Sequence, residues 1–381
     1  MSNSEDEPGL VELANVLDEQ GMIGYTRAFV DDFRNGLNHI SFDRFEWMQN
    51  LAKKTWSGVL CLGMGGSAAG GDFLSALASF QGSKPVHVQR DYALPSWWDS
   101  SWLILATSHS GNTEETLEAT ETALKAGATV VAISTGGILA GLPEIYPNCH
   151  LIASVGGQPP RSAFGHIFSR QLGLLRHLGV VPVPETGADD AMLERLQTAM
   201  DGFDILKDPE GDIAQLAMCM VDRPIALLGP TEITPVLNRF KNQLNENAAR
   251  FARVGVVPEM NHNESVAWGG IGEDRDASGI EHVLLLLTWK GMHERVQRRM
   301  DWMIAHAATD YAWKIEGEGV TLLESMLHLC ILTDWISLAL SLLHGKDPAS
   351  IGPIFALKAH LDSVNLSVQR PEDEPWIWKI L

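Results

Sequence analysis

The stretch W-L-I-L-A-T-S-H-S-G-N-T-E-E-T, from Trp102 to Thr116, contains the pattern that decides the fold. Its first five residues form an apolar run that predicts a buried strand, and the acidic residues from Glu114 onward are typical of the first turn of a helix. The polar residues between them, Ser108 to Thr113, therefore form a loop that joins a strand to a helix. We expect backbone N–H groups of this loop and helix start to face a ligand.

The same succession of strand, turn and helix recurs through the first half of the chain. Parallel strands need long crossover connections, so strands separated by helices of this length predict βαβ units and a parallel sheet. The predicted strands are 59–62, 86–88, 102–106, 129–133 and 150–153, and the predicted helices are 71–79, 113–126 and 163–178.

The second half repeats this organisation, which predicts a second α/β domain. We place the predicted boundary in the Pro/Gly/Asp-rich stretch 181–190. The predicted domains are an N-terminal helical segment at 1–55, which we expect to be a peripheral lid, a first domain at 56–185 and a second at 186–381. In the second half, helices are predicted at about 190–220, 234–252 and 322–343, and strands at 224–228, 253–257 and 283–287.

Composition and charge limit the classes of partner. The formal net charge of −20 opposes nonspecific attraction to nucleic acid or to an anionic membrane. The acidic N-terminus does not resemble a signal peptide, and the longest apolar stretches are interrupted by charge or glycine, so we expect a cytoplasmic protein without a membrane span. The four cysteines lie far apart without metal-binding spacing, and we expect neither a metal nor a redox cofactor.

A glycine-rich turn, G-M-G-G-S-A-A-G-G from Gly63 to Gly71, follows the first strand. Glycines allow a backbone to approach an anion, and the start of the following helix supplies N–H donors. The spacing does not complete a dinucleotide fingerprint, and no lysine follows as a P-loop requires. A nucleotide site and a purely structural tight turn remain alternatives for this motif.

The two loops converge if both strands belong to one parallel sheet, because ligands bind beyond the carboxyl ends of such strands. The hydroxyls of Ser67, Ser108, Ser110 and Thr113 would then form a cup for a phosphate. For Thr113 alone, capping of the following helix is the alternative.

These motifs resemble a known family. G-M-G-G-S followed by S-x-S-G-N-T-x-E-T is similar to the sugar isomerase (SIS) domain, a Rossmann-like fold that binds phosphosugars. The segments N-E-N-A at 245–248 and N-H-N-E at 261–264, with Pro160-Arg161 before them, resemble the bifunctional phosphoglucose/phosphomannose isomerase branch. The resemblance implies two Rossmann-like SIS subdomains, each a mainly parallel sheet flanked by helices.

The resemblance also implies a reaction and a set of site residues. The reaction is the interconversion of glucose 6-phosphate, and possibly mannose 6-phosphate, with fructose 6-phosphate through a cis-enediolate. Glu246 would move the proton between C2 and C1, and Arg161 would steady the enediolate. His262 and Lys358 would assist opening of the sugar ring, and Gly66 joins the four hydroxyl residues around the phosphate.

Three expectations about partners and specificity complete the sequence-based prediction. The resemblance implies a homodimer in which His262 reaches the active site of the other subunit. His109 stands where relatives usually have tyrosine, a change that would alter the wall beside the phosphate without removing its donors. The segment 347–351 lies where relatives often carry a threonine linked to use of both epimers, and Ser350 would supply a hydroxyl nearby, so the epimer preference stays open. The alternative function is a phosphosugar-binding regulatory protein, which would need neither Glu246 nor His262.

Overall fold

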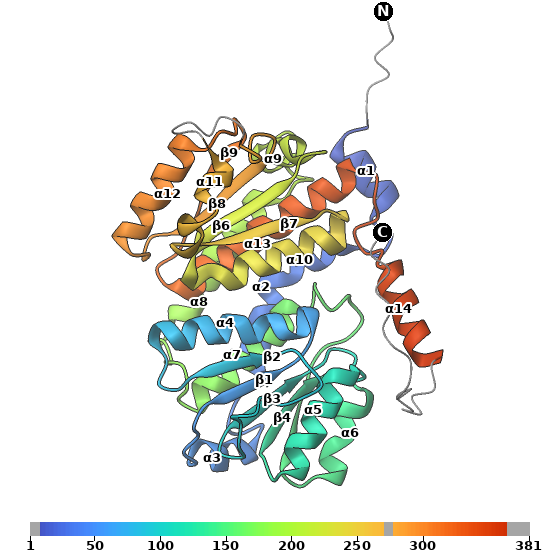
Figure 1. The fold of residues 1–381 in the computed structure, drawn as a ribbon. Coiled ribbons are helices and arrows are strands. Elements are labelled where there is room, and N and C mark those ends of the chain that lie inside the picture. The colour runs from blue at the N-terminus through green and yellow to red at the C-terminus, as the bar shows by residue number, and fades with distance from the viewer. Residues whose placement is uncertain (1–7, 270–276, 364–381) are drawn as a thin grey trace, which may run out of the picture. The chain divides into compact units, whose positions relative to one another are not determined.

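Figure 1 shows the computed structural model of the protein, which describes residues 8–269 and 277–363. These residues fall into two units. One unit extends to Ala349 and contains both β-sheets, and the other begins at Ser350 and contains helix α14 (Gly352–Ser363).

The first sheet has five parallel strands in the order β2-β1-β3-β4-β5. Its central strands are short apolar runs, as strands covered by helices on both faces require. The prediction of parallel βαβ units in the first half is therefore confirmed. The strands are β1 (Val59–Leu62), β2 (Val86–Gln89), β3 (Leu103–Thr107), β4 (Val130–Ser134) and β5 (Cys149–Ala153).

Side chains of this sheet alternate between two apolar layers, because successive residues of a strand point to opposite faces. Leu60 and Ile104 pack with α5 and α6, whereas Cys61 and Leu105 lie in the layer of α4 and α7. The helices are α4 (Gly65–Gln81), α5 (Glu114–Lys125), α6 (Gly137–Ile145) and α7 (Phe164–His177).

The second sheet has four parallel strands in the order β7-β6-β8-β9. The predicted second α/β part is confirmed. Its strands are β6 (Ile225–Pro230), β7 (Ala252–Val257), β8 (Val283–Trp289) and β9 (Ala312–Gly317). The helical elements around it are α8 (Ala188–Phe203), α9 (Asp212–Met220), η1 (Thr231–Ile233), α10 (Thr234–Ala248), η2 (Glu259–His262), α11 (Ser265–Trp268) and α12 (Glu294–His306).

Helix α13 (Leu322–Leu343) has the bounds predicted from the sequence. Its length and hydropathy would suffice to cross a membrane, which the sequence-based expectation had excluded. However, 94% of its apolar window is buried inside the protein, where it packs against α8, α9 and α10. It also carries Asp334, which forms an ion pair with Arg239 of α10. These contacts identify α13 as a core helix.

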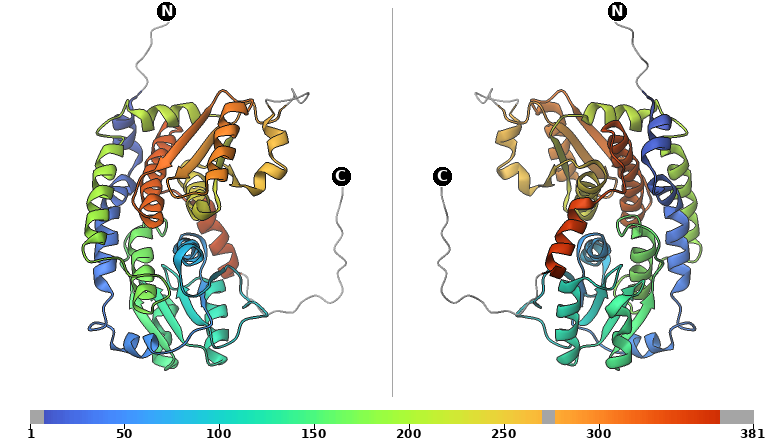
Figure 2. Two further views of the ribbon diagram at one scale, coloured as in Figure 1. Left: turned by 90° about the vertical axis from the view of Figure 1, so that its left-hand side faces the viewer. Right: turned by 90° about the vertical axis from the view of Figure 1, so that its right-hand side faces the viewer.

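The helices before the first strand are α1 (Leu10–Leu17), α2 (Met22–His39) and α3 (Glu46–Ala52). The expectation of a peripheral lid is wrong for α2, which packs against α7 and α8 (Figure 2). Val30 and Phe33 are fully buried, and the ring of Phe29 stacks on that of Phe164. The apolar residues at helical spacing in this segment therefore face the core.

The glycine-rich turn is mostly helical, because α4 begins at Gly65 rather than near residue 71. A Cβ atom on Gly70 would lie 1.9 Å from Gln171 Oε1 of α7, and one on Gly66 would lie 3.2 Å from the carbonyl oxygen of Pro160. Glycine at these positions lets α4 approach its neighbours closely. This close packing is a structural use of the motif that the sequence did not reveal.

Candidate active site

The loops after β1 and β3 meet at the carboxyl edge of the first sheet. The two strands are paired with Leu62 opposite Ala106, so both loops leave the sheet side by side. The backbone N–H of His109 donates a hydrogen bond to Ser67 Oγ at 3.1 Å. The predicted convergence of the loops is confirmed, and phosphate binding by them stays a prediction.

The hydroxyls of the second loop differ in their surroundings. Ser108 is fully buried. Its Oγ lies 2.8 Å from Thr113 Oγ1 and accepts a hydrogen bond from the N–H of Gly111 at 3.1 Å. Thr113 precedes α5 but accepts no hydrogen bond from the helix start, so the capping alternative is wrong. Ser110 is exposed and accepts a bond from the N–H of Asn112 at 3.3 Å. Ser108 thus stabilises the loop, whereas Ser110 lies at its surface.

His109 connects this loop to the segment that leads to Arg161. Its Nε2 lies 3.1 Å from the carbonyl oxygen of Gln158. Burial lowers the pKa of the imidazole, which favours the neutral ring with Nε2–H as donor. This contact could not be predicted from local sequence patterns, because it depends on a backbone carbonyl far away in the chain.

Gly66 brings the phosphate loop against Arg161. A Cβ atom at Gly66 would lie 3.3 Å from the Cα of Arg161, closer than most such contacts in proteins. The segment before α7 therefore passes directly over the start of α4. Arg161 enters the space between the two sheets from this point, on the side of α10.

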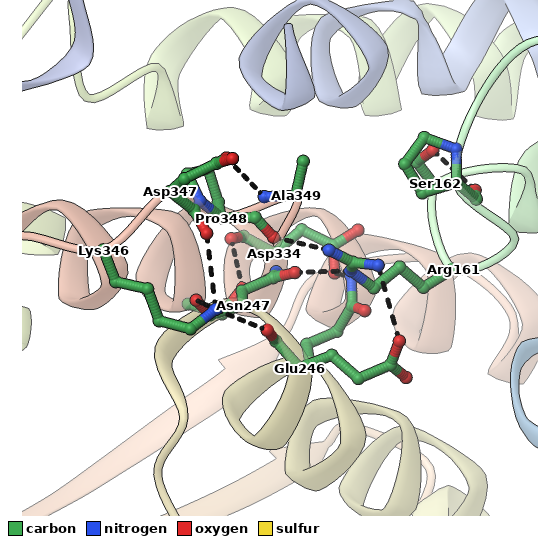
Figure 3. A network of polar contacts seen from close by, with 12 residues as sticks. Arg161, Ser162, Glu246, Asn247, Asp334, Lys346, Asp347, Pro348 and Ala349 are labelled. Atoms are coloured by element: carbon green, nitrogen blue, oxygen red, sulfur yellow. Dashed lines mark hydrogen bonds and ion pairs between the residues drawn. The ribbon is translucent and has the colours of Figure 1, made fainter. Parts of the chain in front are cut away.

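Arg161 lies beside Glu246, as the resemblance implied (Figure 3). Its Nη1 is 3.4 Å from Glu246 Oε2, its Nε donates to Asn247 Oδ1 at 2.7 Å, and its Nη2 donates to the carbonyl oxygen of Pro348 at 2.5 Å. The arginine side chain is only 3% exposed. The guanidinium is therefore held at two nitrogens while the third faces the carboxylate.

Glu246 lies near the end of α10 and keeps 26% of its side chain exposed. Burial raises the pKa of its carboxyl group, although the nearby cations Arg161, Arg239 and Lys346 act in the opposite direction. A carboxylate with a raised pKa is a stronger base than one in water. Its partial exposure leaves it accessible to a ligand.

A small pocket opens beside Glu246, and one wall of it comes from the phosphate loop. It adjoins a second cavity of about 360 Å³, which extends along α4 and α10 to Asp72 and Arg90. The residues that line the small pocket are Gly66, Ala69, Arg161, Phe164, Arg239, Asn242, Gln243 and Glu246. Of the predicted phosphate-binding residues, Gly66 lines the small pocket with Glu246, whereas the hydroxyl residues Ser67, Ser108, Ser110 and Thr113 line neither of these two cavities.

Several residues that organise this site were missed from the sequence. Lys346 Nζ donates to the carbonyl oxygens of Glu246 and Asn247, both at 3.0 Å, at the carboxyl end of α10. Arg239 holds Asp334 with two hydrogen bonds of 2.5 and 2.9 Å. A sequence pattern that could have indicated a buried ion pair is a cation among mostly apolar residues. Arg239 shows this pattern in V-L-N-R-F at 236–240.

Two predicted catalytic residues are not brought to this pocket. His262 is exposed at the end of η2, and within the described part of the chain it forms no hydrogen bond or ion pair with Glu246 or Arg161. It lies next to an open depression lined by Asn261, Ser265 and arginines of α12. Lys358 belongs to α14 in the separate C-terminal unit. Their roles stay predictions.

Within residues 8–269 and 277–363, no group of three or more His, Cys, Asp and Glu side chains is arranged to hold a metal ion. The candidate site therefore consists of hydroxyls, backbone N–H groups, one carboxylate and several cations. Such a set can hold a phosphate, move a proton and stabilise a developing oxyanion.

Comparison with solved structures shows the same fold. Tagatose-6-phosphate ketose/aldose isomerase from Escherichia coli superposes with a TM-score of 0.66 over 86% of this chain and 94% of that chain, at 14% identity. The C-terminal domain of glucosamine-fructose-6-phosphate aminotransferase from Francisella tularensis gives a TM-score of 0.65 over 86% and 98%, at 12% identity. Both likenesses show a shared fold of parallel sheets flanked by helices.

Sequence comparison identifies the family. The model of the bacterial phospho-glucose isomerase C-terminal SIS domain matches residues 210–361. The bifunctional phosphoglucose/phosphomannose isomerase of Caldicellulosiruptor bescii is 33% identical over 80% of this chain and 90% of its own length. The enzyme of the same name from Aquifex aeolicus is 30% identical over 84% and 95%. These two relatives match most of this chain and most of their own length, and the chain therefore belongs to the bifunctional phosphoglucose/phosphomannose isomerase family.

Proposed function

We propose that this protein is an aldose–ketose isomerase that interconverts glucose 6-phosphate and fructose 6-phosphate through a cis-enediolate. The observation that carries the proposal is the approach of Arg161 to Glu246, 3.4 Å apart, in a pocket that Gly66 of the phosphate loop also lines. An enediolate needs a base to form it and a fixed cation to stabilise it. Relatives that match most of this chain carry the corresponding activities in their names.

In the proposed reaction, Glu246 takes the proton from C2 of the open-chain aldose, which leaves the negative charge on O1 of the enediolate. The hydroxyl proton then moves from O2 to O1, and Glu246 returns its proton to C1 as the carbonyl forms at C2. Negative charge moves from the carboxylate to the enediolate oxygen in the first step and returns in the second. Arg161 Nη1 therefore faces one negative charge throughout, and the buried guanidinium is never left uncompensated. The arginine would accelerate the step in so far as it stabilises the charge that develops on the enediolate oxygen more than the charge of the carboxylate.

The phosphate of the substrate would lie between the two loops, held by Gly66, Ser67, Ser108, Ser110 and Thr113. Ser108 is already bonded within its loop, so we assign the direct contacts mainly to the exposed Ser110 and to backbone N–H groups at the start of α4. The helix dipole attracts the phosphate without a lysine or arginine.

His262 would act in the active site of a second copy of the chain. Two features support this part of the proposal: His262 is exposed, and the neighbouring depression carries Arg295, Arg298 and Arg299. The chain as a whole carries a net charge of −20, so this positively charged surface would attract negatively charged surfaces of another copy. We place this homodimer in the cytoplasm, and we assign Lys358 to ring opening beside His262.

A phosphosugar-binding regulatory protein is the alternative. Such a protein needs only the loops around the phosphate, and it has no use for a carboxylate held beside a buried arginine. The pairing of Glu246 with Arg161 therefore favours the enzyme.

The test is incubation of the purified chain with fructose 6-phosphate, with glucose 6-phosphate and mannose 6-phosphate resolved as products. We expect glucose 6-phosphate from the wild type, and the presence of mannose 6-phosphate settles the epimer preference. Glu246→Gln should lower kcat by about 10²- to 10⁴-fold, as loss of a general base does, with little change in KM.

Glu210→Gln is the matched control, because this glutamate is exposed and lies outside the pocket. It should retain the activity of the wild type. A wild type that binds fructose 6-phosphate without converting it would establish the regulatory alternative and refute the proposed enzyme.

A further inference from the structure

Asn247 connects Arg161 to the core helix α13 through consecutive hydrogen bonds (Figure 3 shows the first of them). Its Oδ1 accepts from Arg161 Nε at 2.7 Å, and its Nδ2 donates to Ser337 Oγ at 2.9 Å. Ser337 Oγ donates in turn to the carbonyl oxygen of Asp334 at 2.8 Å. Asn247 is 1% exposed and Ser337 is fully buried, so water does not compete for these bonds.

The network determines which way the amide of Asn247 faces. The hydroxyl of Ser337 has a single hydrogen, which goes to the carbonyl oxygen of Asp334. Ser337 can therefore only accept from Asn247, and the amide nitrogen must face it. The amide oxygen is thereby directed to Arg161, where it accepts the Nε–H.

The two groups that hold Arg161 are both neutral. One is the amide oxygen of Asn247, and the other is the carbonyl oxygen of Pro348. A carboxylate in either place would bind the guanidinium more strongly, but it would also neutralise its charge. With neutral acceptors, the charge of Arg161 stays available at Nη1, the nitrogen that faces Glu246.

Other charged groups around this point are engaged elsewhere. Asp334 accepts two bonds from Arg239 and one from Gln243. Asp347, in the turn after α13, accepts the N–H of Ala349. The charged groups that influence the pKa of Arg161 or Glu246 from the surrounding elements are Arg239, Lys346 and Asp347.

We propose that Asn247 is a positioning residue for the isomerisation: its neutral amide fixes Arg161 while leaving the guanidinium charge for the enediolate. This inference rests on the proposed function. It assigns to the second asparagine of the N-E-N-A segment a role in catalysis that acts through Arg161 alone.

Asn247→Asp tests the proposal, because the substitution keeps the shape and an acceptor for Arg161 and adds one negative charge. Turnover of fructose 6-phosphate should fall at least about tenfold in kcat, with KM changed less than about twofold. The added charge disfavours ionisation of Glu246, so the acidic limb of the pH profile should move to higher pH. A purely structural role would lower stability without moving this limb.

A binding experiment separates this inference from the proposed function. It compares two ligands by calorimetry: a hexitol 6-phosphate, uncharged at the reacting carbons, and a five-carbon aldonate 5-phosphate, whose planar carboxylate presents the charge of the enediolate. Asn247→Asp should weaken binding of the aldonate by about tenfold or more, and that of the hexitol little. Ser337→Ala removes the acceptor that orients the amide of Asn247 and adds no charge. It should weaken binding of the aldonate by about threefold and leave binding of the hexitol unchanged.

Asn148→Asp is the matched control, since the amide of Asn148 donates to the backbone carbonyls of Leu124 and Ala128 and does not line the pocket beside Glu246. It should bind both ligands as the wild type does. If both site variants keep the wild-type ratio of the two affinities, the positioning role of Asn247 is wrong and the isomerase proposal stands. If the wild type binds neither ligand, both proposals fail.

Discussion

At the scale of single residues, Glu246 should lower the stability of the fold at neutral pH. Burial raises the pKa of its carboxyl group, so the folded chain binds this proton more tightly than the unfolded chain. The resulting stabilisation is complete below the pKa of an ordinary glutamate and is lost as the pH rises through the higher, folded value. Glu246→Gln resembles the protonated form and should melt about 2–4 °C above the wild type at pH 8.

At pH 4 the melting temperatures of Glu246→Gln and the wild type should differ less than at pH 8. Differential scanning calorimetry can measure both differences. Glu210→Gln, on the surface, should leave the melting temperature unchanged at both pH values. A Glu246→Gln variant that melts below the wild type at pH 8 would mean that Arg161 outweighs burial and that the ionised carboxylate is the stabilised form.

Only those residues of the candidate site that belong to recognisable sequence motifs could be predicted. The approach of Ser67 to the loop of Ser108 followed from the rule that parallel strands end at one edge, and the pairing of Arg161 with Glu246 followed from the family resemblance. The anchors of Arg161 could not be predicted in this way. A backbone carbonyl such as that of Pro348 has no signature in a sequence, and its position depends on the complete tertiary fold.

At the scale of elements, the buried pair of Arg239 and Asp334 joins α10 to α13. Both side chains are less than a tenth exposed, and Gln243 adds a third hydrogen bond to the carboxylate. Asp334→Asn would leave a buried guanidinium without its counter-charge. We expect it to lower the free energy of unfolding by about 3–5 kcal/mol in urea titration.

The surface pair of Arg34 and Asp31 provides the comparison for this prediction. Its carboxylate is 69% exposed, and Asp31→Asn should cost less than about 1 kcal/mol. A cost below 1 kcal/mol for Asp334→Asn as well would show that the interior between α10 and α13 admits water or rearranges to neutralise Arg239.

Continuously apolar elements were predicted well, whereas several elements with mixed polarity were missed. The central strands of the first sheet and α13 are continuous apolar runs, so their existence followed from hydrophobicity alone. Helices α6 and α12 and strand β9 were left unassigned. α6 contains Pro143, and α12 is rich in charged residues. In β9, exposed residues alternate with residues that are mostly half-buried, so its apolar pattern is weak. We therefore attribute the stability of these three elements to tertiary packing rather than to a local sequence pattern.

At the scale of the whole molecule, the proposed shared site predicts complementation between two inactive variants. Glu246→Gln and His262→Ala should each be nearly inactive as homodimers. Subunit exchange between them should rebuild one complete site in each heterodimer, because the two lesions then fall in different sites. The expected activity is about half that of the wild type per heterodimer, measured on heterodimers isolated with two different affinity tags.

Heterodimers of two Glu246→Gln subunits with different tags are the control and should stay inactive. Mixed heterodimers that remain as inactive as their parents would place Glu246 and His262 in one subunit or remove His262 from the reaction. The domain boundary at 181–190 and the place of Lys358 stay predictions, since α14 forms a unit of its own.

Arg161 enters the pocket from the segment before α7, whereas the groups that it meets, Glu246, Asn247 and Pro348, all belong to the second half of the chain. The proposed reacting centre therefore lies where the first and second halves of the chain meet. Neither half of the polypeptide, produced alone, could contain a working catalyst, however well it folded. If the proposed site is correct, turnover depends on how the two halves are docked, and a displacement of about 1 Å between Arg161 and Glu246 would lower it by about 10²-fold.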